Sequence, residues 1–144
     1  MRPHPGLLSG LRSGLLAAAA LAIACPACQD KTSSAYIADE FADAYFRRMD
    51  QDAALKFTAL GATEMLDKEI EATKALRESG YTPAEAASAV SFVRGPAVPR
   101  DARVDFHYHM TIRAGDGPPS TQDADVELAR IGGGWKVVSV HITR

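Results

Sequence analysis

Cysteine is nearly absent from this chain. Its 144 residues include two, Cys25 and Cys28, and none follows them. No disulfide can therefore hold the rest of the protein together. The sequence also lacks the run of about 20 apolar residues that a transmembrane helix requires. Its longest apolar run, from Leu15 to Ala24, is roughly half that length, which disfavours a membrane-spanning helix.

Several functional signatures are missing as well. No Gly-rich phosphate loop follows a predicted strand, no nucleophile elbow occurs, and we find no internal repeat. Arg2 and Arg12 are the only Lys or Arg residues before Cys25, so the remaining chain has 14 basic and 18 acidic residues, a net charge of −4. This mild acidity disfavours nucleic acid as a partner. Nothing in the sequence indicates a cofactor.

The first 24 residues have the pattern of a signal peptide. Arg2 and Arg12 form a basic start, an apolar stretch follows, and Ala22-Ile23-Ala24 is a small-residue cleavage site. The site also resembles the lipobox of bacterial lipoproteins, in which the next residue, here Cys25, is acylated; Cys28 is a second candidate. We therefore expect an exported protein anchored by lipid on the periplasmic side of the cell envelope. Soluble periplasmic or secreted protein is the alternative.

Helices dominate the first half of what remains. Residues 25–34 are a polar tether in this interpretation, and residues 35–144 are long enough for one domain. Ile37, Phe41, Tyr45 and Met49 recur every four residues, which predicts an amphipathic helix.

A second helical region follows. We expect Asp50 to cap its start, Gly61 to interrupt it and Gly80 to end it. Leu66 and Ile70 would then face inward. A set of charged residues is assigned to the solvated face: Lys68, Glu69, Glu71, Lys74 and Glu78.

Strands dominate the second half. Thr82-Pro83-Ala84-Glu85 is a capping box, and residues 89–93 suit either a helix or an edge strand, with Pro96 and Pro99 at the sheet margin. Apolar and polar residues alternate over 104–112, and two further strands are predicted at 123–131 and 135–143, around Gly132-Gly133-Gly134.

The hairpin register follows from sorting these side chains by face. If Ile131 lies opposite Trp135, Leu128 faces Val138 and Val126 faces Val140, while polar pairs such as Asp125 and His141 lie on the other face.

This order predicts an α+β fold: N-terminal amphipathic helices packed on a curved three- to four-stranded antiparallel sheet. The stretches Phe41-Ala-Asp-Ala-Tyr-Phe46, Asp50-Gln-Asp-Ala-Ala-Leu55 and Gly133-Gly-Trp-Lys-Val-Val138 resemble the nuclear-transport-factor-two-like (cystatin-like cone) superfamily, especially its small envelope lipoproteins. The resemblance implies a conical pocket, which such folds use in isomerase-like enzymes, ligand carriers and assembly modules.

Strand parity selects the candidate pocket residues. Phe106 and Tyr108 point inward and, with Tyr45, are the possible pocket. An isomerase-like mechanism needs an inward carboxylate, and Asp105 has the wrong parity, so no catalytic residue is predicted. The predicted core also contains other apolar residues: Phe41, Leu66, Ile70, Val126, Leu128, Val138 and Val140.

Three histidines lie on the opposite face. His107 and His109 share one side of their strand, and His141 stands near Asp125 and Glu127, so these histidines are candidate metal ligands. Alternating polar residues are also what a solvated or subunit-contacting face looks like, and we predict that instead. We expect a non-catalytic binding or assembly module, with a protein partner or homodimer on this face. An apolar-ligand carrier or isomerase-like enzyme is the alternative.

Overall fold

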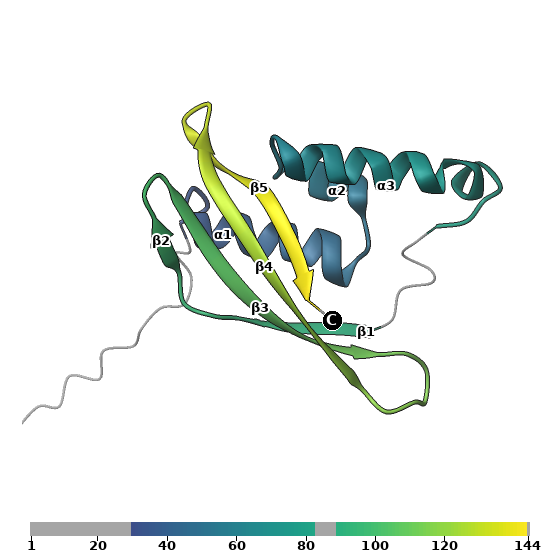
Figure 1. Ribbon diagram of the computed structural model, residues 1–144. Coiled ribbons are helices and arrows are strands. Elements are labelled where there is room, and N and C mark those ends of the chain that lie inside the picture. The colour runs from purple at the N-terminus through teal and green to yellow at the C-terminus, as the bar shows by residue number, and fades with distance from the viewer. Residues whose placement is uncertain (1–29, 83–88, 144) are drawn as a thin grey trace, which may run out of the picture.

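The computed structural model describes residues 30–82 and 89–143 and has an α+β fold, in which helices pack against an antiparallel sheet (Figure 1). The leader, Cys25, Cys28 and most of the predicted capping box lie outside the described residues. The helical elements are α1 (Ser34–Ala42), the π-helix η1 (Asp43–Arg47), α2 (Gln51–Leu55) and α3 (Gly61–Glu78). The strands are β1 (Ala89–Arg94), β2 (Val98–Arg100), β3 (Arg103–Arg113), β4 (Ser120–Ile131) and β5 (Gly134–Thr143).

The sheet has the order β1-β3-β4-β5, with β2 also paired to β3. Residues 89–94 form an edge strand, as one of the two predicted alternatives had it. The described strands number five rather than three or four, because β1 and β2 pair with successive parts of β3. The edge is interrupted after Gly95, whose N–H donates to the His107 carbonyl at 2.7 Å, and Pro96 has no N–H to continue the ladder.

The predicted parity of β3 is confirmed. Phe106, Tyr108 and Met110 are buried against the helices, while His107 and His109 are exposed on the opposite face. Alternation of apolar and polar residues fixed these faces because successive strand side chains point to opposite sides of a sheet.

The β4–β5 register matches the prediction over only part of its length. Val126 lies opposite Val140, and Asp125 opposite His141, as expected. Leu128, however, lies opposite Val137, because Gly132 and Gly133 form a two-residue turn with φ of 60° and 85°. A turn one residue shorter than predicted moves the register by one, and an unpaired residue in β5, Val138, restores it.

The first helix departs from a regular 3.6-residue repeat. A wide π turn at η1, closed by the Arg48 N–H to the Asp43 carbonyl at 3.0 Å, carries Phe46 into the core. Met49 has a φ of 51°, outside the helical range, and is 37% exposed. Its predicted place on the buried helix face is therefore wrong. The next helix begins as predicted, with the Asp50 carboxylate accepting from the Ala53 N–H.

Most of the predicted core is buried. Tyr45 and Val140 are partly buried beside it, and Ile70 is only partly buried. The α3 helix begins at Gly61, where a Cβ would lie 3.3 Å from the Val138 carbonyl oxygen, so a side chain here would crowd the backbone of β5. A second group joins the core: Ala38, Ala42, Ala44, Phe46, Ala54, Ala62, Met110, Ala124 and Val137.

Candidate functional site

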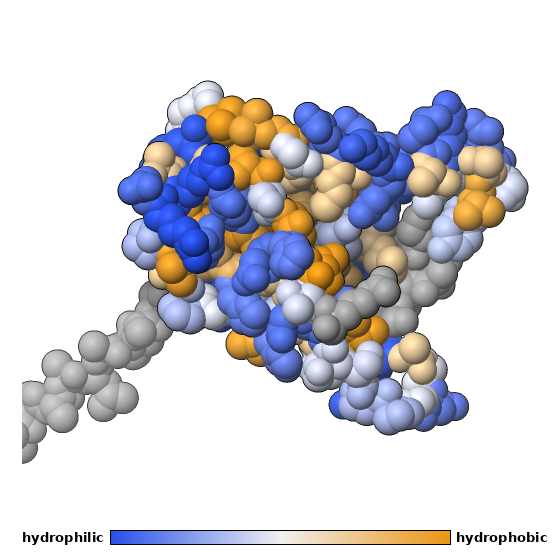
Figure 2. Space-filling view, viewed as in Figure 1, coloured by the Kyte–Doolittle hydropathy of each residue, from blue (hydrophilic) through white to orange (hydrophobic). Residues whose placement is uncertain are grey.

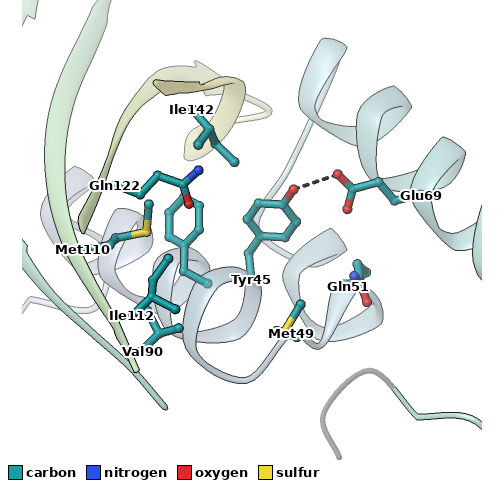
Figure 3. Close-up of a pocket in the computed structure, with 10 residues that line it drawn as sticks. Tyr45, Met49, Gln51, Glu69, Val90, Met110, Ile112, Gln122 and Ile142 are labelled. Carbon is teal, nitrogen blue, oxygen red and sulfur yellow. Dashed lines mark hydrogen bonds between the residues drawn. The ribbon is translucent and has the colours of Figure 1, made fainter. Parts of the chain in front are cut away.

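A pocket of about 440 Å³ lies between the π turn, α3 and the inner face of the sheet (Figure 3). Each of the strands β1, β3, β4 and β5 contributes a lining residue, so the pocket forms only when the whole sheet has assembled. Its lining is apolar with a few polar groups, as small-molecule sites usually are. The lining residues are Tyr45, Phe46, Met49, Gln51, Glu69, Val90, Met110, Ile112, Gln122 and Ile142.

Of the three residues predicted for a pocket, Tyr45 alone lines it. Phe106 and Tyr108 are fully buried in the core beneath. The Tyr108 hydroxyl donates to Asp39 Oδ1 on α1 at 2.8 Å, and neither residue lines the pocket. Burial, with the charge of Asp39, raises the pKa of Tyr108 far above its ordinary value, so this hydroxyl keeps its proton as a structural donor.

The polar centre of the pocket is a tyrosine–carboxylate pair. The Tyr45 hydroxyl donates to Glu69 Oε1 at 2.7 Å, and Figure 3 shows the two side chains reaching toward each other from different helices. Burial raises the pKa of Tyr45 far above its ordinary value, and the hydrogen bond to Glu69 adds to the rise. The hydroxyl therefore stays a donor at all physiological pH values, and the carboxylate is its acceptor.

Glu69 was wrongly assigned to the solvated face of the second helical region. In the structure it lies beside the pocket and is half-buried. The spacing carried a signal for this position: Leu66, Glu69 and Thr73 follow one another at three and four residues, so they share one face of α3. Strand parity excludes an inward carboxylate from β3 only, and this carboxylate comes from the helix α3.

The two glutamines of the pocket, Gln51 and Gln122, are its remaining polar side chains. The Gln51 side-chain oxygen accepts from Arg77 Nη2 at 2.8 Å, and Arg77 also binds Asp52 and Thr73. Gln122 projects from β4 into the hollow in Figure 3. Among the lining residues that the structure describes, Glu69 is the one charged group, and it makes the electrostatic potential inside the pocket more negative.

The π turn sets the shape of the pocket. Tyr45 belongs to η1, and Met49 follows it at a left-handed backbone position, so both reach the pocket from one distorted turn. A regular helix would rotate these side chains relative to the sheet. Such single π turns often mark functional sites, because the wider turn repositions side chains.

The outer face of the sheet carries the predicted histidines. His107 Nδ1 lies 2.9 Å from Asp125 Oδ1, and His109 Nδ1 lies 2.7 Å from Asp123 Oδ1, across β3 and β4. Although His141 lies opposite Asp125, that carboxylate binds His107. In residues 30–82 and 89–143 no group of three or more His, Cys, Asp or Glu side chains is arranged to hold a metal ion. Figure 2 shows hydrophilic side chains over β2 and β3 on this face. The predicted subunit contact here stays a prediction.

One consequence of the His107 pairing is a pH dependence of stability. The hydrogen bond to Asp125 raises the pKa of His107 above its ordinary value. Its contribution is therefore fully present below the pKa of the unfolded chain and is lost as pH rises through the folded-state pKa. We expect an NMR titration to show the His107 pKa falling in Asp125→Asn. Asp116→Asn removes the same charge from an exposed loop, and an equal fall there would contradict the pairing.

No family model and no curated protein matches this sequence. Solved structures do. A protein of unknown function described as NTF-2-like, from Shewanella oneidensis, has a TM-score of 0.52 at 14% identity, covering 76% of this chain and 95% of the other. A chain named as a calcium/calmodulin-dependent protein kinase type II association domain, from Thiobacillus denitrificans, has the same score and identity, with coverages of 76% and 93%. A third, with NTF2 in its name, scores 0.53 at 13% identity, covering 79% and 100%.

Proposed function

Because the chain has an NTF2-like fold, we propose that it is a binding module that takes a small, largely apolar ligand into the pocket between Tyr45 and the sheet. The observation that carries this proposal is the pocket itself: about 440 Å³, walled mainly by apolar side chains, with a hydrogen-bonding pair on one side. Pockets of this size and composition suit small organic molecules. The proposal replaces Phe106 and Tyr108 as ligand contacts with Glu69, Met110 and Ile142.

A ligand should stabilise the folded protein, and blocking the pocket should abolish the effect. We expect decanol to raise the melting temperature of the wild-type protein, since a ligand at 100 times its Kd adds about 2.7 kcal/mol to the free energy of unfolding. Ile142→Trp places a larger ring in the pocket wall and should remove most of this gain. Ile131→Trp is the matched control, because Ile131 is 39% exposed against 38% for Ile142 and does not line the pocket. Equal responses of both variants would contradict the proposal.

Proton transfer on a bound ligand is a second candidate, favoured by the inward Glu69 carboxylate. A base at this position could take a proton from a carbon next to a carbonyl group. The Tyr45 hydroxyl, however, already donates to Glu69, so it is not free to stabilise a developing oxyanion. This geometry favours binding over catalysis. Exchange of such protons of a bound ketone into D₂O, faster in wild type than in Glu69→Gln, would favour the enzyme instead.

We also propose export and attachment to the cell envelope through lipid on Cys25. The support is the basic start, short apolar stretch and Ala-Ile-Ala site before this residue. No helix in the described part of the chain is long and apolar enough to span a membrane. Two or more acyl chains would hold the domain at a membrane surface, whereas one would hold it weakly.

The anchor has a direct test in the full-length protein expressed in a bacterium. We expect mass spectrometry to find a diacylglyceryl group on Cys25 at the N-terminus, and Cys25→Ser to move the protein into the soluble fraction. Cys28→Ser is the control and should stay with the membranes. An unmodified chain that begins at another residue would contradict the proposal.

A further inference from the structure

The charge inside the pocket limits which ligand it can take. Glu69 is the one charged residue among the described lining residues, and none of these, within 30–82 and 89–143, is Lys, Arg or His. Arg77 contacts Gln51 of the lining, but its guanidinium is held by Gln51, Asp52 and Thr73, and its ion pair is with Asp52 rather than Glu69. An anionic ligand such as a fatty acid would bring its carboxylate into an apolar hollow without a positive partner, which is costly.

The hydrogen bond between Tyr45 and Glu69 also favours a ligand with a hydrogen-bond donor over an anion. The Tyr45 hydroxyl donates its single hydrogen to Glu69 Oε1. The pair therefore offers a ligand only acceptors, namely the second carboxylate oxygen and the lone pairs of the hydroxyl. A ligand head that binds at this pair must therefore donate a hydrogen bond. The rings of Tyr45 and Phe46 also line the pocket and attract a cation through their faces.

We propose that the pocket selects an apolar ligand that carries a protonated amine, with the ammonium group bound by Glu69 and the hydrocarbon part packed against Met110, Ile112 and Ile142. This inference rests on the proposed function and names the chemical class of its ligand. The ammonium group supplies three donors to a site of acceptors, and its charge is opposite to that of Glu69. An alcohol of the same chain length keeps one donor and loses the charge.

Three ligands with one hydrocarbon chain test the selectivity: decylamine, decanol and decanoate, each below its micelle concentration. We expect calorimetric titration of the wild-type protein to give about tenfold tighter binding of decylamine than of decanol, and the weakest binding for decanoate. Binding of decanol and decanoate as tight as that of decylamine would overturn the inference and leave the proposed function intact. Failure of all three to bind would overturn the proposed function as well.

Variants locate the head group. Glu69→Gln should weaken decylamine binding about tenfold and change decanol binding less than about twofold. Glu71→Gln removes the same charge from an exposed site on the same helix and should leave both affinities unchanged. Equal losses of decylamine binding in the two variants would show a general effect of net charge and overturn the inference.

Tyr45→Phe removes the hydroxyl and so distinguishes its contribution to ligand binding from that of the Glu69 carboxylate. It frees Glu69 Oε1 for the ammonium group, so decylamine should bind at least as tightly as to wild type. Loss of binding in Tyr45→Phe together with full binding in Glu69→Gln would overturn the inference. If Glu69→Gln does not fold, the wild-type affinities for the three ligands still decide the outcome.

Discussion

Phe106→Ala should lower the free energy of unfolding by about 3–5 kcal/mol, a large fraction of the total of about 5–15 kcal/mol that is typical of a folded domain. Phe106 is 1% exposed, lies on the inner face of β3 and has the Arg94 guanidinium 4.9 Å above its ring. Its removal leaves a cavity that sheet and helices cannot fill without moving together. Urea denaturation, monitored by circular dichroism, measures the decrease in the free energy of unfolding.

The neighbouring residue gives the control for this prediction. His107→Ala changes an exposed side chain on the other face of the same strand and should alter the free energy of unfolding by about 0.5 kcal/mol or less. Equal losses in the two variants would mean that the faces of β3 are reversed. His107, His109 and Asp105 would then point to the helices.

Asp39→Ala should cost about 2 kcal/mol, because one carboxylate accepts a hydrogen bond from Tyr108 and forms an ion pair with Arg94 next to the core. Asp39 Oδ1 accepts from the Tyr108 hydroxyl at 2.8 Å and lies 2.9 Å from Arg94 Nε. Removing one partner of a fully buried ion pair costs about 3–5 kcal/mol, and the side chains here keep 27% and 31% of their exposure, so solvent reduces the loss. Thermal and urea denaturation measure it.

A double variant tests the origin of that loss. In Asp39→Ala/Arg94→Met no unpaired charge remains, so most of the lost stability should return. Glu71→Ala is the exposed control: its partner Lys74 and Glu71 itself are 60% and 74% exposed, and the change should stay within about 0.5 kcal/mol. A double variant no more stable than Asp39→Ala would show that the Tyr108 hydroxyl, not Arg94, accounts for the cost.

The strand pattern could be predicted from the sequence because strand geometry depends on local alternation. The inward positions of Phe106, Tyr108 and Met110 follow from a repeat of two, which tertiary contacts do not change. The pairing of Val126 with Val140 follows from sorting polar and apolar side chains. Both predictions depend only on residues near one another in the sheet.

The site could be predicted only in part. The place of Tyr45 on a buried helix face was predicted, but its partner was not, because Glu69 is 24 residues away and reaches the pocket only when α3 packs against α2 and β5. The π turn has no sequence signal that we recognise; a regular helical repeat gave Met49 the wrong environment. The predicted hairpin register was also wrong between Leu128 and the turn. The turn is one residue shorter than predicted, and the bulge in β5 restores the predicted pairing from Glu127 onward.

The bulge at Val138 makes this hairpin tolerant of a change in length during evolution. With the present two-residue turn, Ile131 pairs with Gly134 and one extra residue must be absorbed in β5. A single deletion in the glycine stretch, with the two-residue turn kept, would let Leu128 pair with Val138 directly, so the ladder would become regular without reversing the buried face. Homologous hairpins one residue shorter can therefore keep the same pocket walls, and sequence alignments should place that gap between Ile131 and Val138.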